Sequence, residues 1–528
     1  MFRFLSMKKN QKPKPAKSID LDGIDPKVYK RRWWTLATLC LTLLGVMLAN
    51  SSLNMALPEM AVDLGLGQLE LTWVVNVYTL VFASLLFTAG AFGDRYGRKL
   101  AMQIGLAIFV VGSLYAGIIA HTATELIIAR VVMGLGGALV MPTTLSIINN
   151  TFPRGERARA VAIWSGVAGV GMMIGSIVSG VLLEHFTWHS LFYFSAIIAV
   201  IGFTSNQFLA RESRDEKKSP VDWTGGLFSA IGIFGIVYGI TEAPSKGITE
   251  PFVLTSLTAG VIGITLFILW ELRTKFPMLD VRLFKNRAFS ASSLVLTLAF
   301  LAMSGVFFSM SQLLQLILGM SVLESSLAML PLMIPMLLIS PLIPNLVKKI
   351  GARFTIAGGM LITSIAFVIM STWTADMTYL NLFIGMFILM MGIVAAMTPG
   401  TNILMAAVPR NRSGMGSAMN DTTRELGGAL GVAVLGAVLS SAYDKNIAET
   451  ASKFTGGIKD ALEGSLASAL NAAQHLGPAA DTVARAAKEA WMGGLSTASI
   501  TAAIIIFISA LIAFFALPKH SEKQSDTI

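Results

Sequence analysis

Cysteine is almost absent from this sequence of 528 residues, in which Cys40 is the only one. A lone thiol excludes an intrachain disulfide and a cluster of thiolate metal ligands. Histidine is also scarce, and its five residues are scattered along the chain at positions 121, 185, 189, 475 and 520. We therefore expect no metal site, no cofactor and no enzyme active site.

Charge is scarce as well, because Asp, Glu, Lys and Arg make up 13% of the chain whereas hydrophobic residues make up 54%. A water-soluble protein would need more polar surface, so lipid is expected to be the main solvent. The net charge of +10 does not indicate nucleic-acid binding, which needs a basic face on a folded soluble domain. The sequence also lacks a Gly-Lys-Ser/Thr phosphate-binding motif, so ATP-driven pumping would require another chain.

Long apolar runs are abundant, and a run of about 20 residues is enough for a helix to cross about 30 Å of hydrocarbon. The sequence predicts an all-α polytopic membrane protein with fourteen membrane-spanning helices. They cover residues 33–57, 71–92, 100–119, 126–148, 159–183, 190–210, 223–242, 252–271, 289–317, 323–344, 353–373, 379–404, 414–442 and 494–516.

Lys and Arg gather in alternate connections between these runs, and such connections stay in the cytoplasm. The segment 1–32 is strongly basic and lacks a small-residue cleavage site, so we expect a cytoplasmic leader before a retained first helix. Both termini are therefore predicted to be cytoplasmic, in the inner membrane of a bacterium.

The two ends of the chain match each other at a nearly fixed offset. Gly97, Gly105 and Gly136 correspond to Gly351, Gly359 and Gly392, and Pro153-Arg154 corresponds to Pro409-Arg410. A register kept through several helices indicates a duplicated six-helix unit, which is typical of transporters. The predicted parts are the leader 1–32, bundles 33–210 and 288–516, a central insert 211–287, and a tail 517–528. Within the second bundle, 443–492 is predicted to form an external helical hairpin, either an interfacial cap or a functional lid.

The connection after the second predicted helix contains Gly90, Asp94, Arg95, Gly97, Arg98 and Lys99. This spacing resembles the signature loop of the major facilitator superfamily, and the resemblance implies a cytoplasmic charge latch that gates transport. The alternative is an ordinary basic cytoplasmic loop. In the second half Lys348 stands where the first copy has Asp94, so the latch is predicted to be asymmetric.

Two further motifs resemble those of the superfamily. Arg130 in the fourth predicted helix matches an arginine implicated in proton coupling, although a buried arginine that is paired for structural reasons fits equally well. Gly171, Gly175 and Gly180 in the fifth helix resemble the motif of antiporters, with Ser176 at the position of its proline. Small residues at these spacings also serve ordinary helix packing.

The thirteenth predicted helix carries three charges. Asp421 and Glu425 are four residues apart and share a helical face, and Arg424 lies between them in sequence. These groups could titrate as a coupled cluster, or they could form a static ion-pair cluster. An acid in a helix bundle holds its proton more readily, whereas a cation favours the loss of that proton. A proton and a cationic substrate would therefore compete at such a site.

The thirteenth-helix segment, together with residues 222–226 and 282–289, makes the chain similar to the fourteen-helix drug:proton antiporters over residues 33–516. That resemblance implies cation or proton coupling at Asp421 and Glu425. One departure is Ala49, which occupies the place of an acid at the end of the first helix. Its absence leaves the handling of dicationic substrates and the proton count open.

The resemblance implies a proton-coupled antiporter that exports amphipathic or cationic drugs from the cytoplasm or inner leaflet by alternating access. Its expected partners are a small amphipathic substrate, protons and the lipid bilayer, and the protein is expected to be a monomer. The alternatives are a dedicated exporter of one metabolite or lipid and a membrane sensor without transport. The polar or aromatic residues that could line its cavity are Asn50, Asn54, Asn76, Tyr78, Trp164, Gln312 and Gln315.

Overall fold

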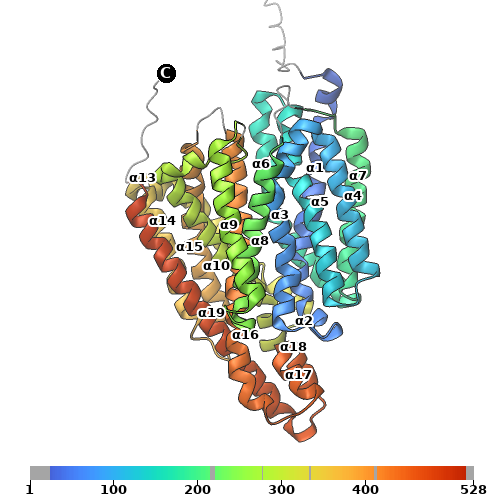
Figure 1. Cartoon of the computed structure of the whole chain (residues 1–528), viewed down its shortest axis with the longest axis vertical. Helices are drawn as coiled ribbons and strands as arrows, with labels where there is room; N and C mark the ends of the chain where they lie inside the picture. The colour runs from blue at the N-terminus through green and yellow to red at the C-terminus, as the bar shows by residue number, and fades with distance from the viewer. Residues whose placement is uncertain (1–23, 215–220, 276, 332–333, 409–412, 519–528) are drawn as a thin grey trace, which may run out of the picture.

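The computed structural model describes residues 24–214, 221–275, 277–331, 334–408 and 413–518, and the secondary structure of these ranges is helical. Most long helices run side by side along the longest axis of the molecule (Figure 1). The first half consists of α1 (Pro26–Ser51), α2 (Leu53–Asp63), α3 (Gln68–Tyr96), α4 (Arg98–Ile118), α5 (Ala123–Thr151), α6 (Arg154–His185) and α7 (His189–Leu209).

A central pair of helices and the second half follow. The central pair is α8 (Trp223–Lys246) and α9 (Pro251–Arg273), followed by the short 3-10 helix η1 (Val281–Lys285). The second half consists of α10 (Arg287–Gln312), the π-helical η2 (Leu313–Ile317), α11 (Val322–Ala328), α12 (Ile334–Ile339), η4 (Ser340–Leu342), α13 (Ile343–Ile350), α14 (Ala352–Met370), α15 (Tyr379–Ala406), α16 (Ser413–Ala451), α17 (Gly457–Gly464), α18 (Leu466–Ala473), η6 (Gly477–Ala479) and α19 (Ala480–Ala516).

Twelve helical segments of the described chain are long and apolar enough to cross a membrane, so the predicted count of fourteen is not confirmed. The predicted helix 159–183 lies inside α6, in which Ile174–His185 is the apolar part. The predicted helix 323–344 is a succession of short helices, α11 to α13. Prolines at 335, 341 and 344 explain this break, because proline lacks a backbone N–H and clashes with the preceding turn.

The duplication inferred from glycine spacing has a counterpart in the packing. In the first half, a Cβ added to Gly136 would lie 2.6 Å from the carbonyl oxygen of Gly105, so α4 and α5 are in backbone contact. In the second half, a Cβ on Gly359 would lie 2.6 Å from the carbonyl oxygen of Gly392, which brings α14 and α15 together in the same way. Equivalent glycines therefore permit equivalent close helix pairs.

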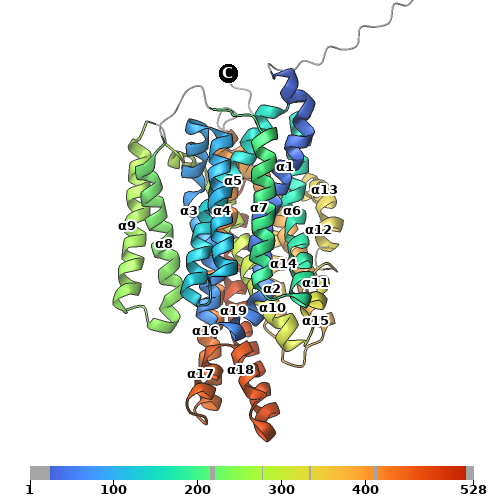
Figure 2. The same cartoon turned by 90° about the vertical axis from the view of Figure 1, so that its right-hand side faces the viewer.

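The central pair packs on the outside of the bundle, against α3 and α16, and thus beside the boundary between the two halves (Figure 2). Its own helices touch where a Cβ on Gly235 would lie 2.8 Å from the backbone nitrogen of Gly260. The indole of Trp73 in α3 donates a hydrogen bond to Glu242 of α8, and Glu242 forms an ion pair with Lys246 at 3.0 Å. This contact fixes the pair to the first half.

The two ends of the bundle differ. The starts of α1, α4 and α14 lie at one end, here called the basic end, and α17 and α18 project from the other, here called the far end (Figures 1 and 2). In the region 443–492, which is predicted to form a helical hairpin, α16 continues to Ala451 and α19 begins at Ala480, with α17 and α18 between them. The alanine-rich sequence past residue 442 favours continuation of the helix. The hydroxyl of Tyr443 donates to the carbonyl of Leu462 at 2.8 Å and holds α17 against α16.

Candidate functional site

A cavity lies between the two halves, lined by residues of α1, α2, α3 and α6 on one side and of α10, α11 and α16 on the other. Its volume is about 170 Å³, which is below the roughly 300–1,000 Å³ of pockets for drug-sized ligands. A ligand of that size would therefore require the halves to move apart. The lining residues are mainly Met, Phe and Ser, with two charges: Met47, Ser51, Asn54, Met55, Val75, Thr79, Ser176, Phe300, Met303, Ser304, Phe307, Ser326, Met329, Leu330, Arg424, Glu425, Gly428 and Val432.

The charged segment predicted in the thirteenth helix belongs to α16. Arg424 and Glu425 line the cavity, and Asp421 lies one turn earlier and is half-buried. Both acids interact electrostatically with Arg424. Among the described residues, neither carboxylate forms an ion pair with the guanidinium of Arg424. That guanidinium lies 5.3 Å from the ring centroid of Phe300. Arg424 and Glu425 are therefore accessible to a ligand or a proton in the cavity.

Arg130 is placed differently, because it is fully buried inside the first half. Its Nε donates to the carbonyl of Val74 at 3.1 Å, and its Nη1 donates to the carbonyl of Ala49 at 3.0 Å. Its guanidinium lies 4.3 Å from the ring centroid of Tyr78. Ala49, the position without the expected acid, thus meets Arg130 through its backbone oxygen. These contacts tie α5 to α1 and α3.

The loop predicted as a latch lies at the basic end. Asp94 and Arg98, four residues apart, form an ion pair at 2.7 Å. Gly97 lies between them with a φ of 131° and separates α3 from α4. Gly90 and Gly93 face α5, where added Cβ atoms would lie 3.7 Å from Pro142 and 2.9 Å from Thr143. The guanidinium of Arg95 lies 5.5 Å from the ring centroid of Tyr96.

The same loop binds the last turn of α7 and the segment that follows it. The ammonium of Lys99 donates to the carbonyl of Gln207 at 2.6 Å, and the backbone N–H groups of Lys99 and Leu100 both donate to the carboxylate of Glu212 at 3.1 Å. The sequence motif did not indicate Glu212. Glu212 reaches this loop because α7 packs beside α4, a contact that the sequence alone did not reveal.

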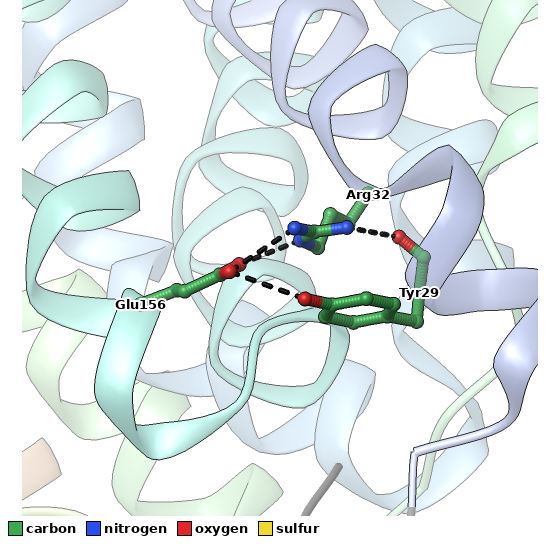
Figure 3. A network of polar contacts seen from close by, with 3 residues as sticks. All are labelled: Tyr29, Arg32 and Glu156. Carbon is green, nitrogen blue, oxygen red and sulfur yellow. Dashed lines mark hydrogen bonds and ion pairs between the residues drawn. The ribbon is translucent and has the colours of Figure 1, made fainter. Parts of the chain in front are cut away.

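Another ionic contact at this end joins α1 to α6. Nε of Arg32 lies 2.6 Å from Oε2 of Glu156, and the hydroxyl of Tyr29 donates to the other carboxylate oxygen at 3.3 Å (Figure 3). The hydrogen bond from Arg32 is the main cause that lowers the pKa of Glu156 below its ordinary 4.5. The first half is therefore tied together at the basic end by an ion pair near the starts of α1 and α6.

The three glycines of the antiporter-like motif lie on α6 and have two different partners. Added Cβ atoms would meet Met47 at 3.3 Å for Gly171 and Ser51 at 2.1 Å for Gly175, so these two pack against α1. Gly180 faces the other half, where a Cβ would lie 2.6 Å from the hydroxyl of Ser326 in α11. Gly180 therefore permits a close contact across the boundary between the halves.

Further contacts across that boundary lie toward the far end. The side-chain amide of Gln315 in η2 donates to the carbonyl of Met55 in α2 at 3.0 Å, and a Cβ on Gly436 would lie 3.1 Å from the hydroxyl of Thr72. The hydroxyl of Ser468 in α18 donates to the carbonyl of Ala61 at 3.5 Å. The halves are thus joined on the far side of the cavity.

The remaining candidates for cavity lining have varied positions. Asn54 lines the cavity, whereas Asn76 is fully buried in α3. The indole of Trp164 donates to the hydroxyl of Thr144 at 3.1 Å. The amide oxygen of Gln312 accepts from the indole of Trp491 at 3.2 Å, in the core of the second half. The side chain of Asn50 lies outside the described residues. The sequence did not single out Phe300 and Phe307 in the lining, since their residue type is common throughout the apolar spans.

Solved structures with a similar fold are transporters. A bacterial homologue of the human lysosomal transporter Spinster, in an inward-facing conformation, matches with a TM-score of 0.63 and 18% identity over 92% of this chain and 97% of its own. The POT family transporter PepTSo matches with a TM-score of 0.61 and 14% identity over 91% and 98% of the two chains. At these identities the similarity establishes the fold.

Sequence relatives are named for drug efflux and resistance. The multidrug efflux pump LfrA of Mycolicibacterium smegmatis is 31% identical over 91% of this chain and 95% of its own length. The methyl viologen resistance protein SmvA of Salmonella typhimurium is 29% identical over 93% of this chain and the full length of that protein. The sequence profile of the Major Facilitator Superfamily matches residues 39–432, and this multi-pass membrane protein therefore belongs to that family of transporters.

Proposed function

We propose that this protein is a proton-coupled antiporter that exports amphipathic or cationic drugs from the cytoplasm or inner leaflet. The observation that carries the proposal is the cavity between the halves, in which Arg424 and Glu425 stand among methionine and phenylalanine side chains. Thioethers repack around ligands of different shape, and aromatic faces attract cations. Such a lining suits a range of lipophilic cations. The names of the relatives agree with this substrate class.

The coupling step follows from charge competition at α16. A cationic substrate in the cavity stabilises the ionised form of Glu425, whereas an empty cavity favours its protonated form. Substrate binding from the cytoplasm therefore releases a proton, and substrate release outside allows a proton to bind. Asp421, one turn away, provides a second acid that interacts with Arg424. Two protons moving down about 100 mV would supply about 4.6 kcal/mol, enough to accumulate a neutral substrate about a thousandfold.

Alternating access in this proposal is a movement of the two halves about the cavity. The contacts of Gly180, Gln315 and Gly436 join the halves toward the far end, and in this proposal the described state takes up substrate from the basic end. Opening outward would break these contacts and bring the loop with Asp94 and Arg98 against the second half. In this proposal the two moving bundles are residues 33–210 and 288–516, the central insert is residues 211–287, and the protein is a monomer.

Topology completes the proposal. We assign α6 and the broken run from α11 to α13 as two additional membrane crossings, which gives fourteen. An even number of crossings places both ends of the chain on the same side. The basic end carries Arg95, Lys99 and Lys348, and positively charged ends face the cytoplasm. The region of α17 and α18 is then extracellular or periplasmic.

The test uses inside-out vesicles that are energised to acidify their lumen. Lipophilic cations and neutral drugs are added while the pH gradient is recorded, with wild type compared to Glu425→Gln and Asp421→Asn. Substrate should dissipate the gradient in wild type, and Glu425→Gln should reduce this response to that of empty vesicles. A correctly inserted wild-type protein that leaves the gradient unchanged across the whole panel would rule out drug:proton antiport. A response to a single compound would identify a dedicated exporter instead.

A further inference from the structure

The N-terminus of α4 in the first half has a built-in anionic partner. The first N–H groups of a helix lack intrahelical acceptors and carry partial positive charge, so they attract anions. In α4, the carboxylate of Glu212 accepts from two of them, those of Lys99 and Leu100. The neighbouring N–H of Arg98 donates to the carbonyl of Ser213 at 3.0 Å. The segment after α7 therefore caps this helix.

In the matching helix of the second half, α14, no acidic side chain among the described residues caps the start. It begins after Gly351, which has a φ of 89°. Gly97, the equivalent residue before α4, also has a positive φ. The repeat aligns Lys99 and Leu100 with Arg353 and Phe354, and the backbone N–H groups of Arg353 and Phe354 have no side-chain acceptor among the described residues.

A second cavity lies beside this uncapped helix start. It has a volume of about 990 Å³ and is bounded by the ends of α10, α13, α14, α15 and α19 at the basic end. Its charged lining residues are Arg287, Lys348 and Arg353, all cations. Within the described part of the chain none of the three forms an ion pair, and Nε of Arg353 is buried without a hydrogen-bond partner. The site thus has positive charge and free donors in excess.

Part of the wall of this cavity is apolar. Phe515 and Leu517 from the end of α19 and Val347 and Ile403 from α13 and α15 line it. The guanidinium of Arg353 lies 4.6 Å from the ring centroid of Phe514, so this aromatic group supports the cation. A free inorganic anion would use the cations and leave the apolar wall in contact with water. A ligand with both an anionic group and a hydrocarbon chain would use both parts.

We propose that this cavity binds an anionic phospholipid, with its phosphate at the N-terminus of α14 and its acyl chains along the apolar wall. The cavity lies where membrane helices end, which is the level of lipid headgroups, and basic pockets between such helices attract anionic lipids. The carboxylate of Glu212 in the first half is the internal equivalent of this phosphate. The proposal concerns a site separate from the central cavity and does not depend on the transported substrate.

The test measures lipid binding to the purified full-length chain in detergent. Native mass spectrometry follows a titration with phosphatidylglycerol, beside matched titrations with phosphatidylcholine and inorganic phosphate. Phosphatidylglycerol should bind at least about five-fold more tightly than the zwitterionic lipid, since one Lys or Arg at an anionic lipid surface contributes on the order of 1 kcal/mol. Equal binding of both lipids would overturn the proposal. Saturation by inorganic phosphate that prevents phosphatidylglycerol binding at similar concentrations would replace the lipid with a free anion.

Adjacent lysines provide the matched variants. Lys348 lines the cavity and Lys349 does not, although both are exposed on the same short helix. Lys348→Gln and Arg353→Gln should each weaken phosphatidylglycerol binding about five-fold, and Lys349→Gln should leave it unchanged. Thermal unfolding of each variant in detergent checks that the fold is retained. If Lys348→Gln and Lys349→Gln have equal effects, the lipid is held by general surface charge and the site is wrong.

Discussion

The two halves of this protein share one duplicated architecture but use their charged residues in different ways. In the first half Arg130 is enclosed and donates to backbone carbonyls of α1 and α3. In the second half Arg424 and Glu425 face the central cavity without an ion pair among the described residues. The first half is also tied by Glu212 and by Arg32 with Glu156. The first half thus holds its charges in contacts within its own helices, whereas the second half presents two charges to the cavity.

The largest effect is expected where the two halves touch. Gly180→Leu would place a side chain where Ser326 lies 2.6 Å from an added Cβ, so the far end could not close. We expect substrate-evoked proton movement in vesicles to fall nearly to background while the protein still inserts. Gly358→Leu is the control, because an added Cβ there has no neighbour within 4 Å. Equal transport by both variants would mean that this contact does not form during the cycle.

Substitution of Arg130 and of Arg424 tests whether the enclosed arginine contributes more to stability than the arginine that faces the cavity. Arg130→Met removes a buried charged group together with the hydrogen bonds that it donates to the carbonyls of Val74 and Ala49. This should lower the free energy of unfolding by about 3 kcal/mol or more. Arg424→Met should change it by less than about 1 kcal/mol, because its side chain faces the cavity. Thermal unfolding in detergent measures both, and a stable Arg130→Met variant with defective proton coupling would assign Arg130 to coupling.

A smaller effect is expected from the cap of α4. Glu212→Gln keeps the shape of the side chain but removes its charge from two N–H groups at a helix N-terminus. The loss should be about 1 kcal/mol, typical of an N-terminal cap. Hydrogen exchange of the amides at the start of α4 should accelerate, while those at the start of α14 should stay as in wild type. Unchanged exchange at α4 would contradict the difference drawn between the two halves.

The smallest effect concerns acid stability at the basic end. Arg32 holds the pKa of Glu156 below 4.5, so the pair stabilises the protein above that pH. The stabilisation should disappear as the pH falls through the lowered pKa, when the folded protein takes up the proton. Because the carboxylate is 32% exposed, the contribution should be at most about 1 kcal/mol. Between pH 7 and pH 3 the free energy of unfolding of the wild type should include a decline from this pair, and Glu156→Gln should lack that decline.

Several features of the fold followed from local sequence patterns. Apolar length predicted most of the membrane helices, and the glycine register predicted the repeat that the contacts of Gly105 with Gly136 and of Gly359 with Gly392 now explain. The break within 323–344 was missed because hydropathy averages over prolines that stop a helix. The site was less accessible to prediction. Asn54 was found among the cavity residues, but Tyr78, Trp164 and Gln312 bond within one half.

The sequence by itself determined that the chain is a bundle of membrane helices, because each apolar run must satisfy its backbone hydrogen bonds internally in lipid. It also placed Asp421, Arg424 and Glu425 close together, since residues three and four apart share a helical face. Only the tertiary structure decided that Arg424 and Glu425 face a cavity and that Arg130 meets the carbonyl of Ala49. Such contacts join residues far apart in sequence, and they depend on which face each helix turns toward its neighbours. Hydropathy gives the length of a helix but leaves that rotation to packing.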